Sequence, residues 1–179
     1  MLLVDHIHVP LVRVIRANWK DALDTSFSRA SGGRWNAANT HAVLYVSCSM
    51  AVARAVALDV FRIGALRLED LAPEMRPALA EIDWAGRVVD MASATGIAAA
   101  GFRASYPDRY THSRTQSASS IWFQAGVEGV VCRSASVARL GSGTWTGPHE
   151  TWGETAIFTD NAALTPTLRR LRRGQAWLR

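Results

Sequence analysis

The spacing of hydrophobic and polar positions predicts strands and helices that alternate irregularly along the chain. Residues 11–17, LVRVIRA, alternate apolar and basic positions, which is typical of a half-buried strand. The other predicted strands cover residues 42–47, 65–70, 128–134 and 154–159, and the predicted helices cover 49–62, 73 to about 82, and 108–126. Residues 18–33 and 141–153 are predicted loops. This order favours an α+β fold, a mixed sheet with packed helices, over a doubly wound sheet.

Two of the predicted helices carry recognisable ends. Ser47 or Ser49 can cap the start of the alanine-rich helix, because a serine hydroxyl accepts a hydrogen bond from the first turn. Gly126 can end the helix over 108–126, because glycine tolerates the left-handed conformation found there.

The length and composition of the chain are those of one globular domain. Its 179 residues are 49% hydrophobic and 20% charged, so we expect a single domain over residues 1–179. No apolar run reaches the roughly 18 residues of a membrane span. The opening residues, MLLVDHIHVP, lack a basic stretch followed by a long apolar one. A signal peptide is therefore not expected, and the cytoplasm is the expected location.

The net charge of +5 comes almost entirely from arginine, since Lys20 is the only lysine. The last segment, TPTLRRLRRGQAWLR, concentrates five arginines, and Thr165 followed by Pro166 is a typical helix start. An apolar stripe on such a helix would consist of Leu164, Leu168, Leu171 and Trp177. We therefore predict a docked basic helix over residues 165–179, in preference to an arm that binds nucleic acid or an acidic partner.

Cysteine and histidine positions predict neither a disulfide nor a metal site. Cys48 and Cys132 are far apart and show no CxxC spacing. His6 and His8 alternate on a short segment, but no cysteine or carboxylate cluster joins them. We expect solvated histidines and no bound metal.

The most informative segment is SGGRWNAANTHAVLYVS, residues 31–47. Paired glycines let backbone approach a neighbour where a Cβ would clash, and Arg34 directly after them can present its donor fork to a cleft. Trp35 can pack beneath Arg34, Asn36 can hold the turn, and Tyr45 can reach the rim of the cleft. Such a rim suits a ligand with a phosphate and a flat ring. A glycine turn with a surface arginine and core aromatics explains the same residues equally well.

Two segments of the chain resemble the RES domain, the toxin of RES–Xre toxin–antitoxin modules. The first runs from LVRVIRANWKDALDTSF through GGRWN to VLYVS, and the second is GVEGVVCRS, preceded by the helical segment TQSASSIWFQ. Together they span about residues 10–158. The resemblance implies that three residues are catalytic, namely Arg34, Tyr45 and Ser134. It implies that the ligand is bound by Arg13, Arg34, Trp35, Asn36, Tyr45 and Ser134.

The chain departs from the family pattern at one carboxylate. The family's glutamate lies eleven residues after the tyrosine, and that position is Val56 here. A glutamate at this position would point at the ribose of the ligand. Asp59 lies one turn further along the same predicted helix, and Glu150 and Glu154 fall in a late loop and strand that could face the cleft.

The resemblance implies an ADP-ribosyltransferase-like fold that consumes NAD as a substrate and requires no cofactor. Such enzymes break the nicotinamide–ribose bond by hydrolysis, by phosphorolysis or by transfer of ADP-ribose to a protein. In this picture Arg34 clamps the pyrophosphate, Tyr45 stacks on nicotinamide or ribose, and the Ser134 hydroxyl binds ribose or phosphate. The chain has no GxGxxG after its first strand, so a Rossmann site is not indicated.

The implied partners are an Xre-type antitoxin that blocks the cleft, NAD, and a protein target if ADP-ribose is transferred. Neither a membrane nor direct nucleic-acid binding is expected. Two function classes stay open. One is an NAD-consuming toxin attenuated by Val56, and the other is a non-catalytic RES-fold module that binds a nucleotide or its antitoxin.

Overall fold

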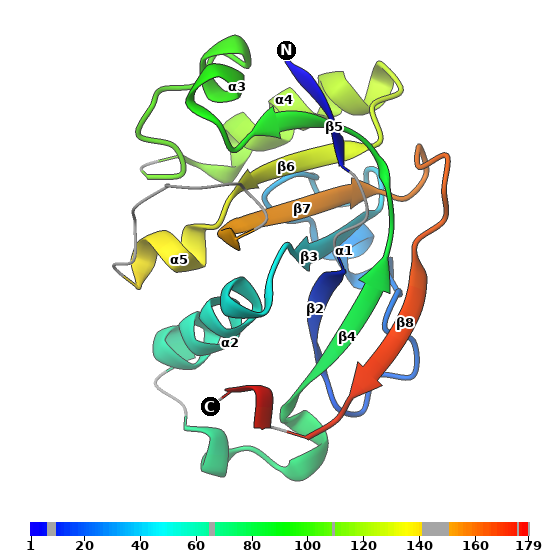
Figure 1. Cartoon of the computed structure of the whole chain (residues 1–179), viewed down its shortest axis with the longest axis vertical. Coiled ribbons are helices and arrows are strands. Elements are labelled where there is room, and N and C mark those ends of the chain that lie inside the picture. Colours follow the sequence, from blue (N-terminus) through cyan, green and yellow to red (C-terminus); the bar gives the residue numbers. More distant parts are fainter. Residues whose placement is uncertain (7–9, 65–66, 109, 141–150, 175, 179) are drawn as a thin grey trace.

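An eight-stranded mixed sheet runs through the fold, with its strands in the order β1-β5-β6-β7-β3-β2-β4-β8 (Figure 1). The computed structural model describes residues 1–6, 10–64, 67–108, 110–140, 151–174 and 176–178. The strands are β1 (Leu3–His6), β2 (Leu11–Arg16), β3 (Val43–Ser47), β4 (Pro77–Asp83), β5 (Gly86–Met91), β6 (Gly129–Arg133), β7 (Gly153–Phe158) and β8 (Thr167–Arg172). β5 and β6 are parallel, and the other described neighbours are antiparallel. The expected α+β class with a mixed sheet is confirmed.

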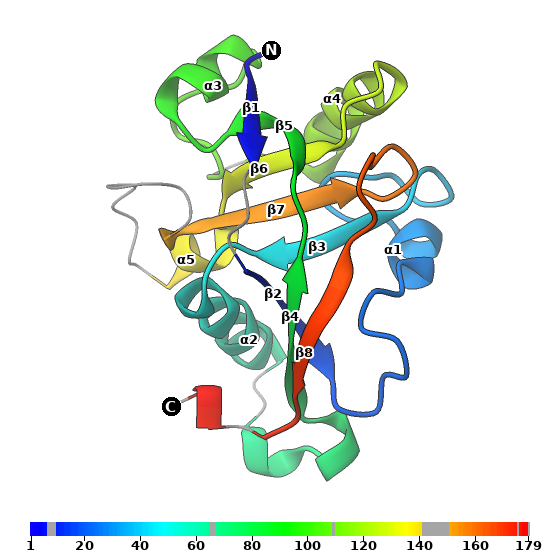
Figure 2. The same ribbon diagram turned by 45° about the vertical axis from the view of Figure 1, so that its right-hand side comes forward.

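Helices pack against several strands of the sheet. They are α1 (Ser26–Ser31), α2 (Met50–Gly64), α3 (Ala94–Ala99), α4 (His112–Gln124) and α5 (Ala135–Arg139), with 3₁₀ turns at Leu68–Asp70, Pro73–Met75 and Ala176–Leu178. Figure 2 shows α1 next to β3, and α2 with α5 on the opposite side of the molecule. The predicted ends of two helices are confirmed. Ser49 Oγ accepts a hydrogen bond from the Val52 N–H at 3.3 Å, and Gly126 follows α4 with φ of +76°.

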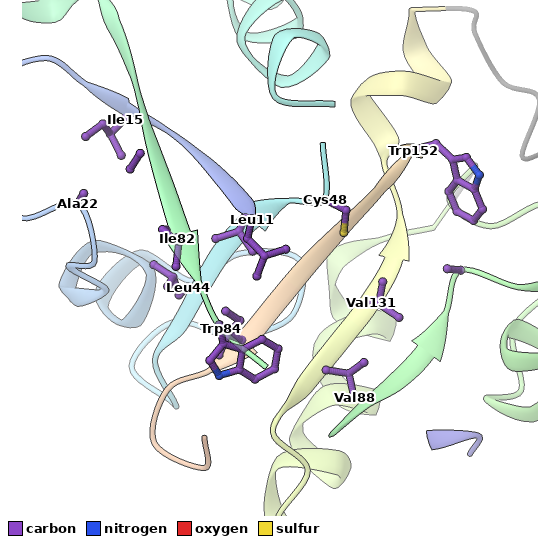
Figure 3. Packing of buried hydrophobic residues seen from close by; sticks show 14 of the residues in the cluster. Leu11, Ile15, Ala22, Leu44, Cys48, Ile82, Trp84, Val88, Val131 and Trp152 are labelled. Atoms are coloured by element: carbon purple, nitrogen blue, oxygen red, sulfur yellow. The ribbon is translucent and has the colours of Figure 1, made fainter. Parts of the chain in front are cut away.

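Apolar side chains fill both faces of the sheet. Leu11, Leu44 and Ile82 belong to a cluster that also contains Trp84 and Val131 (Figure 3). A second cluster joins strand residues to α3 and α4, and it contains Val43, Met91, Val130, Phe158, Ile97 and Trp122. Because side chains alternate between the faces of a strand, Leu44 lies in the first cluster, whereas Val43 and Tyr45 face the second. Tyr45 is thereby placed on the α4 side of the sheet.

Two predicted elements between residues 65 and 82 are wrong. Residues 65–66 lie outside the described part of the chain, and Leu68–Asp70 forms a 3₁₀ turn whose start is held by a hydrogen bond from the Arg67 N–H to the Asp70 carboxylate at 2.8 Å. The helix expected from Pro73 ends after one 3₁₀ turn, and Pro77 begins strand β4. Residues 77–80 of β4 are all buried, and a strand that is buried on both faces loses the alternating pattern.

The predicted C-terminal helix over residues 165–179 is also wrong. The segment forms strand β8, which pairs antiparallel with β4, and then a 3₁₀ turn at Ala176–Leu178. Pairing supplies backbone hydrogen bonds along the edge of β4, and Leu171 packs on the main core. These non-local contacts outweigh the local helix start. Trp177 is nevertheless buried, as a docked segment requires.

Two predicted loops have different outcomes. Residues 18–33 contain the short helix α1 rather than loop alone. Of the loop predicted over 141–153, residues 141–150 lie outside the described part of the chain. Within the described ranges, helices are too short or too polar to cross a membrane.

Candidate active site

A cavity of about 340 Å³ lies between the GGRWN turn, the central strands and the start of α4. Its volume is at the lower end of the range typical of small-molecule sites. The lining residues are Arg13, Phe27, Ser28, Gly32, Gly33, Arg34, Trp35, Tyr45, His112, Cys132, Glu154, Thr155 and Ala156. β2 and β3 pair only between Val12 and Ser47, so the two strands diverge next to this cavity. Arg13, Arg34, Trp35 and Tyr45 are thus brought together, as the sequence predicts.

The two glycines of the turn are required by close contacts. Gly32 has φ of +71°, and a Cβ there would lie 2.7 Å from the Ala38 backbone nitrogen. A Cβ on Gly33 would lie 2.6 Å from the Tyr45 hydroxyl oxygen. Real Cβ atoms do not approach other atoms so closely, so only glycine fits either position. The predicted close backbone approach is confirmed.

The Tyr45 hydroxyl ties the turn to strand β3. It accepts a hydrogen bond from the Trp35 N–H and donates one to Asn36 Oδ1, both at 2.8 Å. Asn36 is fully buried, and its amide donates to the Ser28 carbonyl at 2.6 Å and to the His41 carbonyl at 3.2 Å. Asn36 therefore holds the turn as predicted, but it does not line the cavity.

Helix α4 holds the same turn from the other side. The Thr115 hydroxyl donates to the Arg34 carbonyl at 2.6 Å, and the Gln116 amide donates to the Gly33 carbonyl at 2.7 Å. Ser119 Oγ donates to the Trp35 carbonyl. We missed these positioning residues in the sequence. The available signal was three polar residues at positions 115, 116 and 119, which share one face of a helix.

Arg34 carries its charge into the cavity. Burial is the largest single influence and disfavours the cation, but Tyr106, Glu154 and Cys132 together outweigh it, so the pKa of Arg34 is raised above its ordinary value. The turn backbone is fixed by Tyr45 and α4, so the guanidinium is presented from a rigid base. A rigid, half-buried arginine is well suited to bind a phosphate with two parallel hydrogen bonds.

Arg13 adds a second cation to the cavity and also holds the loop that leads to α1. Its guanidinium donates to the Ala22 carbonyl at 2.6 Å and the Asp24 carbonyl at 3.0 Å, and it lies 5.2 Å from the centre of the Trp19 ring. Burial lowers the pKa of Arg13 to about 10, against the opposing effect of Asp24. Arg13 therefore remains charged at neutral pH.

Aromatic residues form the floor and the mouth of the cavity. Trp35 is 1% exposed and packs against Tyr106 and Trp122, with ring centroids 6.2 and 5.7 Å away. Phe27 on α1 is 70% exposed at the mouth.

Burial raises the pKa of the Cys132 thiol in the wall of the cavity, which keeps the thiol protonated and unsuited to act as a nucleophile.

Ser134 lies outside the cavity lining. It is 0% exposed and caps α5, where its hydroxyl accepts a hydrogen bond from the Val137 N–H at 3.2 Å. The ligand contact implied by the resemblance stays a prediction for this residue.

Neither Val56 nor Asp59 lines the cavity. Val56 packs at the edge of a small cluster of Val52, Ala55 and Val137, between α2 and α5. Asp59 is buried and accepts hydrogen bonds from Arg139 at 2.8 Å and from the Ser136 hydroxyl at 3.1 Å. Its carboxylate is thus used within the α2–α5 contact.

Glu154 lines the cavity together with Arg34 and Tyr45. Its strand neighbours are Ser47 on β3 and Cys132 on β6. Glu150, the other late glutamate considered from the sequence, lies outside the described residues.

The cysteines and histidines give no sign of a metal centre in the part of the chain that is described. Cys48 and Cys132 are buried and unbonded to each other. No group of three or more histidine, cysteine or acidic side chains comes together among the described residues. His6 is buried, so the solvated position expected for it is wrong, and His8 lies outside the described residues.

Comparison with protein families shows to which family the chain belongs. The RES domain matches residues 10–166, which is most of its length. The chain belongs to the RES-domain family. The segment that carries the cavity, from Arg13 through the GGRWN turn to Glu154, lies wholly within the matched RES domain.

A solved structure supports the same fold. The RES domain described here is similar to a chain in the crystal structure of the M. tuberculosis MbcT–MbcA toxin–antitoxin complex, with a TM-score of 0.71 and 18% sequence identity. The match covers 90% of this chain and 81% of that chain. Comparison with curated proteins gives no match.

Proposed function

We propose that this protein is the toxin of a toxin–antitoxin pair and that it consumes NAD by cleaving the nicotinamide–ribose bond. Membership of the RES family and the likeness to a chain of a toxin–antitoxin complex support the toxin role. The proposed chemistry rests on one observation, which is that Arg34, Tyr45 and Arg13 line the same cavity. Cleavage proceeds by hydrolysis, by phosphorolysis, or by transfer of ADP-ribose to a protein.

The charges of the cavity match those of NAD. NAD carries two phosphates at its centre, and Arg34 and Arg13 supply two cationic groups on neighbouring parts of the cavity. The exposed Phe27 ring at the mouth and the Tyr45 ring in the wall offer flat apolar surfaces to a flat ligand ring. Because the GGRWN turn is fixed from two sides, Arg34 and Tyr45 are held in place before the ligand binds.

The partner proposed for the toxin is an Xre-type antitoxin that inserts a segment into the cavity mouth near Arg34. A positively charged, open cavity is a surface that an acidic segment can cover. Binding there would exclude NAD and so switch off the activity.

A second function is favoured by one observation. Val56 occupies the position of the family glutamate and packs in an apolar cluster away from the cavity. A chain without a catalytic carboxylate would be a RES-fold module that binds a nucleotide or its antitoxin without turnover.

Cell growth and calorimetry test the proposed function together. Expression of the wild-type chain should stop growth and lower the NAD pool, and Arg34→Ala should do neither. Calorimetry with ADP-ribose should show at least about tenfold weaker binding to Arg34→Ala, because a charge-assisted clamp is lost. The matched control is Arg87→Ala, which removes an exposed β5 arginine that does not line the cavity.

Each outcome separates the alternatives. Binding of ADP-ribose without any loss of NAD would favour the non-catalytic module. Equal affinity of wild type and Arg34→Ala would contradict the placement of the ligand in this cavity. Co-expression of the cognate antitoxin should restore growth, and restoration with unchanged NAD consumption would contradict blocking of the cavity.

A further inference from the structure

We propose that Glu154 is the catalytic carboxylate of this RES domain. The inference rests on the proposed cleavage of NAD. It assigns to Glu154 the role of the glutamate that the family pattern has at the position of Val56. Among the described residues, Glu154 is the only carboxylate that lines the cavity.

The position of Glu154 is set by the centre of the sheet. Strand β7 lies between β6 and β3, and Glu154 pairs with Cys132 on one side and Ser47 on the other. Side chains alternate along a strand, so Glu154 shares its face with Ala156, which also lines the cavity. The residue is therefore held by backbone pairing on both sides, which is how a catalytic group is kept in place.

Electrostatic contacts place the Glu154 carboxylate close to the other functional groups. Its charge acts on Arg34, Tyr45 and Cys132, all of which line the cavity. The carboxylate makes no hydrogen bond and no salt bridge with another described residue. It is half-buried, so it keeps a surface that a ligand can contact.

Asp59, the other described carboxylate that the sequence offered, is used elsewhere. Asp59 is engaged by Arg139 and Ser136 in the α2–α5 contact. A carboxylate so paired cannot approach a ligand in the cavity without breaking the ion pair that compensates its burial, which is costly. The Glu154 carboxylate has no such ion pair with any residue that the structure describes.

The chemistry of the bond explains why a carboxylate is needed at this place. When the bond between ribose C1′ and the nicotinamide nitrogen breaks, its electron pair moves to the nitrogen and neutral nicotinamide leaves. Positive charge develops on the ribose, as it does in glycoside hydrolysis. The Glu154 carboxylate stabilises this charge, while Arg34 and Arg13 hold the anionic diphosphate.

The same carboxylate completes the reaction with water. A water molecule attacks C1′ and gives its proton to Glu154, which then passes it to solvent. The balance is NAD⁺ and water to ADP-ribose, nicotinamide and one proton. Glu154 begins and ends the cycle as a carboxylate.

The test compares nicotinamide release by the wild type, Glu154→Gln and Glu74→Gln. Glu154→Gln keeps the shape of the side chain and removes its charge, so kcat should fall by about 10²-fold or more. Glu74→Gln makes the same chemical change at an exposed residue outside the cavity and should match the wild type. The affinity of Glu154→Gln for ADP-ribose should stay within a factor of a few of the wild-type value. Its urea midpoint should stay close to that of the wild type.

Three results would overturn the assignment in distinguishable ways. An active wild type with equally active Glu154→Gln removes Glu154 from the mechanism and leaves the proposed function intact. A loss confined to ADP-ribose affinity, with kcat unchanged, makes Glu154 a partner of Arg34 rather than a catalytic group. An inactive wild type overturns both proposals. If Glu154→Gln fails to fold, Glu154→Ala with added formate replaces it, and absence of rescue by formate in a folded protein contradicts the assignment.

Discussion

Removing the Tyr45 hydroxyl should loosen the GGRWN turn while leaving the aromatic wall of the cavity in place. In Tyr45→Phe, the Trp35 N–H loses an acceptor and Asn36 Oδ1 loses a donor, each from a hydrogen bond of 2.8 Å. Asn36 is fully buried, so its oxygen cannot recover the bond with water. Each bond contributes about 0.5–1.5 kcal/mol, and a buried partner left unsatisfied costs about 1–3 kcal/mol. We expect a loss of about 2–4 kcal/mol in the free energy of unfolding.

Urea denaturation followed by tryptophan fluorescence measures this loss. With a slope of about 2 kcal/mol per molar urea, the midpoint should fall by about 1–2 M. The control is Tyr110→Phe, which deletes a hydroxyl that accepts one hydrogen bond from the Arg103 N–H at 2.7 Å near the surface. That variant should lose no more than about 1 kcal/mol. Equal midpoints for Tyr45→Phe and Tyr110→Phe would refute the role of the Tyr45 hydroxyl in holding the turn.

Three other substitutions test separate contacts. The hydrogen bond from Arg139 lowers the pKa of Asp59, so the stability it adds is complete above the unfolded pKa of about 3.9 and is lost as the pH falls through the lower folded value. The stability gap between wild type and Asp59→Asn, measured in urea, should shrink in acid; a constant gap would contradict this. Val56→Glu places a charge in an apolar cluster and should cost about 1–3 kcal/mol without raising nicotinamide release; a large rise in release would instead place position 56 at the ligand. Ser134→Ala and Ser93→Ala each remove an N-cap and should each lower the free energy of unfolding by about 1 kcal/mol. A loss of nicotinamide release in Ser134→Ala but not in Ser93→Ala would reveal the ligand contact implied by the resemblance.

Local patterns predicted most of the central sheet and the core of the site. The strands at Leu11–Arg16, Val43–Ser47, Gly129–Arg133 and Gly153–Phe158 all overlap strands that were predicted from the pattern of apolar positions. The GGRWN segment predicted a tight turn because its glycines, its arginine and its asparagine each have a local physical role. The structure confirms that role for the glycines and for Asn36.

The errors arise where distant segments decide the local structure. Residues 165–172 carry a good helix start, but the free edge of β4 recruits them as strand β8. Residues 77–82 of β4 were predicted to continue a helix from Pro73, since the buried run over residues 77–80 shows no alternation of apolar and polar positions. The contribution of α4 to the turn depends on contacts between residues about 80 positions apart in the chain, such as Gln116 with Gly33 and Asn36, which no local pattern encodes.

The carboxylate of the site shows the same limit. The resemblance to the family pattern pointed to position 56, and Asp59, Glu150 and Glu154 were the alternatives. The pairing of β7 between β3 and β6 brings Glu154 into the cavity, and neither Val56 nor Asp59 lines it.

Proton NMR of NAD incubated with the purified chain tests the cleavage of NAD most directly. The signals of nicotinamide bound to ribose should decay over many turnovers while those of free nicotinamide grow in equal amount, and Arg34→Ala should abolish the change. The second product identifies the acceptor, because ADP-ribose indicates water and a phosphorylated ADP-ribose indicates phosphate. NAD signals that stay unchanged with active-site concentrations of wild-type protein, in the presence and absence of phosphate and without antitoxin, would contradict the proposed function.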